Sequence, residues 1–166
     1  MGTYGYISII AMLCYGFMLL MFLTAKRNKI INSFLVVLTG LLFWTGGSAF
    51  MRAQLWPGCE FWYQVSLLGI LLLPYAYYRF ILAFGGVRNG SVGRIYLVIM
   101  LICFWVNAQF GVFLEAPKMV EKNGAAAFVY EIKPAIIVFF IPSAIFLIHL
   151  LTVIVRICKN NPTMKV

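Results

Sequence analysis

The chain has 166 residues, of which 64% are hydrophobic and 10% are charged, and its formal net charge is +9. An ordinary soluble domain is about 25% charged, and a soluble core cannot bury this much apolar surface, so the composition indicates an integral membrane protein. The basic residues form short clusters between apolar runs and leave no basic face on a soluble domain, which argues against a nucleic-acid-binding protein.

Five apolar segments reach the roughly 20 residues that a helix needs to cross a bilayer. The predicted spans are residues 4–25, 30–51, 61–84, 95–114 and 134–155. We therefore predict an all-α membrane protein, a five-span helical bundle that forms one integral membrane domain over residues 1–166. The lipid bilayer is its first expected partner, and nucleic acid is not expected to be one.

The charged residues separate onto two faces when the spans alternate in direction. One face carries no acidic residue and nine basic ones: Lys26, Arg27, Lys29, Arg79, Arg88, Arg94, Arg156, Lys159 and Lys165. The other face carries Arg52, Lys118, Lys122 and Lys133 with all four acidic residues, Glu60, Glu115, Glu121 and Glu131. Because Lys and Arg collect on the cytoplasmic side, we predict an external N-terminus and a cytoplasmic C-terminus, in a multi-pass protein of the inner (plasma) membrane.

The third span contains a proline and an arginine within its apolar run, "LLLPYAYYRFILAFGG". Pro74 removes a backbone hydrogen bond and is expected to kink the span near its middle. Arg79 lies on the predicted cytoplasmic half, from where its side chain can reach the headgroups. Two interpretations stay open: a kinked span with an anchoring arginine, or a hinge that transmits a signal across the membrane.

Uncharged polar and tryptophan side chains gather at one depth, in the predicted outer halves of the second, third and fourth spans. These residues are Trp44, Ser48, Trp62, Gln64, Ser66, Asn107 and Gln109. Polar side chains in a bilayer usually face other helices, so they form either hydrogen bonds between helices or a ligand pocket that opens to the outside. The pocket hypothesis requires Trp44, Gln64 and Asn107 to face one cavity.

The predicted outer connection before the fifth span, "EAPKMVEKNGAAAFVYEIKP", is long. Asn123-Gly124 is a hairpin turn signal, and "AFVYEI" is rich in residues that favour strands. We predict a short extracellular β-hairpin over residues 118–131, with a disordered loop as the alternative.

The sequence contains no recognisable catalytic set, metal-ligand cluster or cofactor motif, so we expect no enzyme activity, no metal and no cofactor. His149 is the only histidine and lies inside the fifth span. An ionisable group at that depth is a functional candidate, either as an interhelical hydrogen-bonding group or as a proton or ligand site.

Two stretches, "SFLVVLTGLLFWTGGSAFM" and "EFWYQVSLLGILLLPYAYYRFILAFGG", resemble the N-terminal seven-helix sensor region of bacterial histidine kinases and diguanylate cyclases. The matching positions are Trp44, Gly69, Leu73, Pro74, Phe80, Asn107 and the segment from Phe128 to Tyr130. The resemblance covers residues 5–165. Members of this family continue into two further spans and an output domain, so the resemblance implies a chain that stops before its output domain, or a natural short relative.

The resemblance implies that the chain is the ligand-sensing transmembrane region of a bacterial signalling receptor, with a small external molecule as its ligand. The alternative is a small membrane subunit of a transporter or export complex. The corresponding protein partners would be a second copy in a homodimer or another membrane subunit.

Overall fold

The computed structural model describes residues 3–87, 90–122 and 125–160. Five long helices form the molecule: α1 (Thr3–Leu23), α2 (Lys29–Arg52), α3 (Cys59–Phe84), α4 (Ser91–Phe110) and α5 (Ile137–Asn160). Each contains an apolar stretch long enough to cross a membrane. The predicted all-helical, five-span architecture is confirmed.

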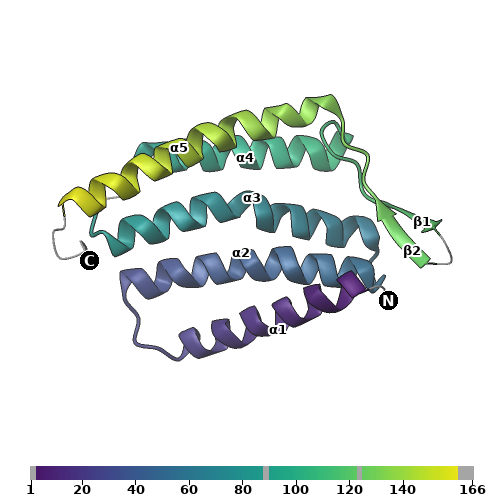
Figure 1. The fold of residues 1–166 in the computed structure, drawn as a ribbon, viewed down its shortest axis with the longest axis horizontal. Helices are drawn as coiled ribbons and strands as arrows, with labels where there is room; N and C mark the ends of the chain where they lie inside the picture. The colour runs from purple at the N-terminus through teal and green to yellow at the C-terminus, as the bar shows by residue number, and fades with distance from the viewer. Residues whose placement is uncertain (1–2, 88–89, 123–124, 161–166) are drawn as a thin grey trace.

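The helices run alternately up and down, and α3 lies between α2 on one side and the pair α4 and α5 on the other (Figure 1). Helices α2 and α4 begin, and α1, α3 and α5 end, at the end of the bundle that we call the basic end. The opposite end carries the strands β1 (Lys118–Lys122) and β2 (Ala125–Val129), and we call it the hairpin end.

Two helix boundaries follow from local backbone chemistry. Asn28 caps α2, because its side-chain oxygen accepts a hydrogen bond from the N–H of Ile31 at 2.7 Å. Helix α4 ends at Phe110, four residues before the predicted end at residue 114, because Gly111 adopts a left-handed conformation with φ of 55°. Its N–H donates to the carbonyl of Asn107 at 2.8 Å and terminates the helix.

The fifth span also differs from its predicted bounds of 134–155. A short 3₁₀ helix, η1 (Pro134–Ile136), comes first, and α5 then continues to Asn160. Proline has no N–H to donate and suits the first turn of a helix, which explains why the helical segment begins at Pro134.

Strands β1 and β2 pair antiparallel, with Lys118 opposite Val129 and Lys122 opposite Ala125. The predicted hairpin is therefore present. Its predicted turn residues, Asn123 and Gly124, lie outside the described residues. An isolated bridge between Leu114 and Ile132 extends the pairing toward the bundle.

Helices α2 and α3 pack backbone against backbone. A methyl group added at Gly47 would lie 2.6 Å from the backbone nitrogen of Ser66, and one added at Gly69 would overlap the backbone of Trp44. Such close approach requires small residues, as is common where membrane helices associate. We call this contact the glycine seam.

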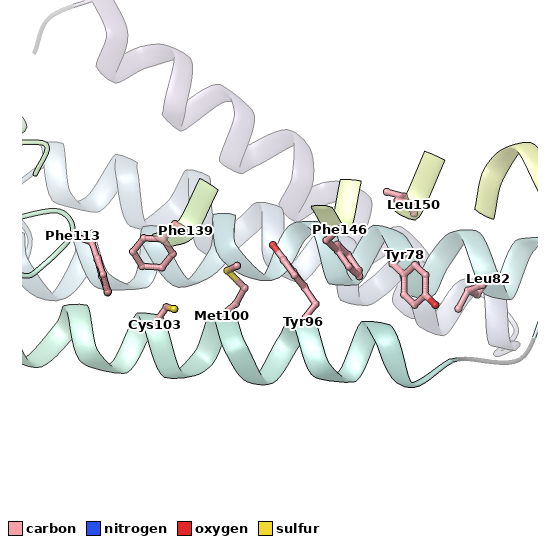
Figure 2. Packing of buried hydrophobic residues seen from close by; sticks show 9 residues of the cluster. All are labelled: Tyr78, Leu82, Tyr96, Met100, Cys103, Phe113, Phe139, Phe146 and Leu150. Atoms are coloured by element: carbon pink, nitrogen blue, oxygen red, sulfur yellow. The ribbon is translucent and has the colours of Figure 1, made fainter. Parts of the chain in front are cut away.

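The contact of α3 with α4 and α5 is built differently, from large side chains (Figure 2). Tyr96 of α4 stacks on Phe146 of α5 with ring centroids 4.0 Å apart, and Phe113 meets Phe139 edge to face at 4.7 Å. Met100, which points from α4 into this cluster, is 1% exposed. The helices on this side of α3 are thus held apart by interlocking aromatic and aliphatic groups.

Candidate functional site

A cavity of about 490 Å³ opens at the hairpin end between α3, α4 and the segment that joins α4 to β1. This volume lies within the usual range for small-molecule sites. Leu67 and Phe104 supply apolar surface. The polar and charged lining groups are Glu60, Tyr63, Gln64, Asn107, Gln109, Glu115 and Lys118.

Asn107, which is 4% exposed, organises the segment that follows α4. Its side-chain oxygen accepts hydrogen bonds from the backbone N–H groups of Phe113 and Leu114, both at 3.0 Å. Its side-chain nitrogen donates to the carbonyl of Leu114 at 3.0 Å. The same carbonyl accepts a hydrogen bond from the Tyr63 hydroxyl at 3.2 Å. One loop residue therefore ties α4 to α3.

Charged groups on the rim connect this segment to the entrance of α5. Lys133 Nζ lies 2.6 Å from a carboxylate oxygen of Glu115 and donates to the carbonyl of Gly111 at 2.9 Å. Lys118 approaches Glu131 at 3.3 Å and Glu115 at 3.6 Å. These groups are largely exposed, so the pairs contribute orientation more than stability.

The ion pairs shift the protonation equilibria of their members. The hydrogen bond and charge of Lys133, with a smaller contribution from the charge of Lys118, hold the pKa of Glu115 below its ordinary value of 4.5. The hydrogen bond and charge of Glu131, together with the charge of Glu115, raise the pKa of Lys118 above 10.5. Both groups are thus charged at neutral pH, and the rim carries fixed charges of both signs.

Three polar side chains of the cavity remain available to a bound molecule. Gln64 is half-buried and Gln109 is exposed, and neither amide has a hydrogen-bond partner among the described residues. Glu60 is exposed and makes no ion pair within the part of the chain that the structure describes. The cavity can therefore offer one carboxylate and two amides, whereas Asn107 is already fully engaged.

The seven predicted ligand-binding residues divide into two groups. Gln64, Asn107 and Gln109 share the cavity, as the pocket hypothesis requires of the first two. Trp44, Ser48, Trp62 and Ser66 are not among the residues that line it. The Trp44 side chain is 40% exposed and lies on α2, across the glycine seam from α4.

Two of the residues outside the cavity make structural hydrogen bonds. The Ser66 hydroxyl donates to the carbonyl of Trp44 at 2.9 Å and bridges α3 to α2. Trp62 Nε1 donates to the carbonyl of Leu55 at 3.1 Å, in the connection that precedes α3. Ser48 is half-buried in α2.

The predicted hinge and proton-site residues lie farther toward the basic end. Helix α3 continues through Pro74 without interruption, and Arg79 is exposed. His149 is half-buried beside Tyr78, with ring centroids 5.8 Å apart. Arg79 and His149 line two further cavities, which are separate from the one at the hairpin end.

Sequence reasoning did not identify Tyr63, Glu115 and Lys133 as parts of this site. A usable signal was present for Lys133, because it lies across the predicted hairpin from Glu115 and the two side chains have opposite charges. Tyr63 carried no such signal, since a tyrosine near the end of a membrane span is common.

Residues 7–165 match the family model described as the N-terminal 7TM region of histidine kinase. No curated protein and no solved structure matches the chain.

Proposed function

Because this chain belongs to the family of N-terminal 7TM regions of histidine kinases, a multi-pass signalling region of the plasma membrane, we propose that it binds a small external molecule in the cavity at the hairpin end. The resemblance seen in the sequence points to the same family. In this proposal, catalysis would belong to a kinase output domain and not to these helices. The single observation that carries the proposal is the cavity next to the Asn107 hydrogen bonds. In it, the Gln64 amide has no hydrogen-bond partner and the Glu60 carboxylate has no ion pair among the described residues.

The available groups favour a small molecule that carries an amino group or another strong hydrogen-bond donor. Such a donor would bind the Glu60 carboxylate, and the Gln64 amide would bind a neighbouring polar atom. Leu67 and Phe104 would contact a short apolar portion. Each hydrogen bond of this kind contributes on the order of 1 kcal/mol.

Signal transmission follows from the two kinds of helix contact. The glycine seam joins α2 to α3 through their backbones and permits little sliding. Helices α4 and α5 meet α3 through side chains that can repack. A ligand between α3 and α4 would therefore move α4 and α5 against a rigid α2–α3 pair, provided that it binds one arrangement more tightly than the other.

The segment between α4 and α5 couples the cavity to the fifth helix. Asn107 holds the backbone at Leu114, the next residue is Glu115, and Glu115 pairs with Lys133 immediately before the helical segment of α5. A change at the cavity would therefore displace α5 together with α4, and the movement would reach the basic end, where an output domain would respond.

The test joins the chain to a histidine kinase output domain and measures autophosphorylation while a panel of small amines, amino acids and sugars is added outside. Ala108 is half-buried and lines the cavity, so Ala108→Trp should fill it and abolish the response to any active compound. Val98 is 54% exposed on the same helix, so Val98→Trp is the matched control and should respond like the wild type.

Two results would contradict the proposal. One is an unchanged response in Ala108→Trp, which would place the receptor site elsewhere. The other is an equal loss in both tryptophan variants, which would show a general effect on α4. Thermal unfolding of each variant without ligand establishes that the folded state is retained.

A further inference from the structure

A second cavity lies at the basic end, between the beginning of α2 and the end of α3, and it has the chemistry of an anion site. It measures about 520 Å³. The polar groups that line it are Lys29, Asn32 and Ser33 of α2 and Arg79 of α3. No ligand-sensing role at the hairpin end requires this cavity.

Its positive charge is not neutralised by the protein. Lys29 and Arg79 are exposed and make no ion pair within residues 3–87, 90–122 and 125–160. All four acidic residues of the sequence, Glu60, Glu115, Glu121 and Glu131, belong to segments at the hairpin end. Arg27 adds a third cation nearby, where its guanidinium donates to the side-chain oxygen of Asn32 at 3.5 Å.

The Ser33 hydroxyl is available to a group that binds in this cavity. Ser33 lines the cavity and is only 6% exposed. Its hydroxyl has no hydrogen-bond partner among the described residues, whereas Thr39 and Thr45 in the same helix donate to carbonyls four residues earlier. The Ser33 hydroxyl is therefore free to donate a hydrogen bond to an anion in the cavity.

The depth of the cavity favours a lipid headgroup as the source of the anion. Lys29 is the first residue of α2, and Arg79 lies five residues before the end of α3, roughly 7–8 Å along the helix. This is the depth of the headgroups for helices that span the bilayer. The exposed apolar side chain of Val87 lines the cavity, and Ile30 and Phe84, also exposed, follow the lining residues Lys29 and Ala83 in the chain.

We propose that this cavity binds the phosphate of an anionic phospholipid headgroup, with Lys29 and Arg79 neutralising the phosphate and the Ser33 hydroxyl donating a hydrogen bond to it. Clusters of basic residues beside membrane helices attract anionic lipids. Here the two cations come from different helices, so one headgroup would bridge α2 and α3 at the end opposite the ligand cavity.

The test compares lipid retention by native mass spectrometry after the chain is released from micelles that contain equal amounts of phosphatidylglycerol and phosphatidylcholine. The wild type should retain phosphatidylglycerol preferentially. Lys29→Gln combined with Arg79→Gln should reduce that preference by roughly fivefold for each cation removed. Ser33→Ala should reduce it by up to about fivefold, the equivalent of one hydrogen bond.

The matched control is Arg94→Gln combined with Lys159→Gln. Both residues are exposed near the basic end, and neither lines the cavity. The control removes the same charge from the same end of the bundle, so it should keep the wild-type preference. An equal loss in the control would show general attraction to the basic end and would overturn the proposed site.

Further arms distinguish the sources of phosphate and guard against misfolding. Inorganic phosphate or glycerol phosphate should not raise the melting temperature of the chain in phosphatidylcholine nanodiscs, and a clear increase would identify a soluble anion as the ligand. If the double variant fails to fold, lipid retention is measured in Lys29→Gln and in Ser33→Ala separately. Unchanged retention of phosphatidylglycerol in both variants would refute the lipid site.

Discussion

The side chain of Asn107 binds both the N–H and the carbonyl of Leu114. Its nitrogen donates to the Leu114 carbonyl and its oxygen accepts from the Leu114 N–H, each at 3.0 Å. The arrangement reproduces the pairing of one strand with another, although it comes from a helix. The two hydrogen bonds fix the course of the segment that leads from α4 to the hairpin.

Replacement of Asn107 should therefore destabilise the fold and not only the ligand site. Asn107→Ala leaves the buried N–H of Phe113 and the part-buried N–H of Leu114 without their partner. We expect a loss of about 1–3 kcal/mol in the free energy of unfolding, measured by denaturation in detergent. Asn32→Ala, at an exposed position with one weak hydrogen bond, is the control. A change in Asn107→Ala no larger than in this control would contradict the structural role.

The glycine seam should not tolerate added atoms. A methyl group at Gly69 would overlap the backbone of Trp44 and lie 2.8 Å from the carbonyl of Gly40, so Gly69→Ala must force α2 and α3 apart. We expect a loss of at least roughly 1–3 kcal/mol, as for other overpacked sites. The control is Gly16→Ala, whose methyl group would have its nearest neighbour, Leu42, at 3.9 Å. Equal thermal stability of the two variants would contradict the seam.

The rim of the ligand cavity should lose an interaction in acid. The pKa of Glu115 is lower in the folded chain than its ordinary value of 4.5, chiefly because of Lys133. Its contribution to stability is therefore complete above about pH 4.5 and is lost as the pH falls through the folded-state pKa. The difference in melting temperature between the wild type and Glu115→Gln should shrink on that acid limb. A difference that persists or grows there would show that the pair with Lys133 is not the cause.

The predicted orientation can be tested with the native cysteines. Cys59 is half-buried at the hairpin end, and Cys158 is exposed at the basic end. With an external N-terminus, a membrane-impermeant thiol reagent should label Cys59 in intact cells and Cys158 only after permeabilisation. Variants that keep one cysteine at a time assign each signal. The opposite labelling order would reverse the topology and place the ligand cavity on the cytoplasmic side.

The number and type of the membrane helices could be predicted from the sequence because each one follows from local composition. A run of about 20 apolar residues must form a helix in lipid, since no water is available to satisfy its backbone. The hairpin was likewise signalled locally, by strand-forming residues that follow Asn123-Gly124. The same reasoning placed the end of the fourth span at residue 114. Helix α4 instead ends at Phe110, because the αL conformation of Gly111 terminates it inside an apolar run.

Only the tertiary structure decided what the outer polar residues do. Depth along a span placed Trp44 and Asn107 at one level, but the direction of a side chain depends on helix rotation and on which helices are neighbours. Helix α2 packs on the opposite side of α3 from α4, and Trp44 does not line the cavity between α3 and α4. Asn107 turns instead to the loop after its own helix, where its side chain binds the N–H groups of Phe113 and Leu114 and the carbonyl of Leu114. The glycine seam joins residues from two helices and the Asn107 hydrogen bonds depend on the fold of the following loop, and composition along the chain specifies neither.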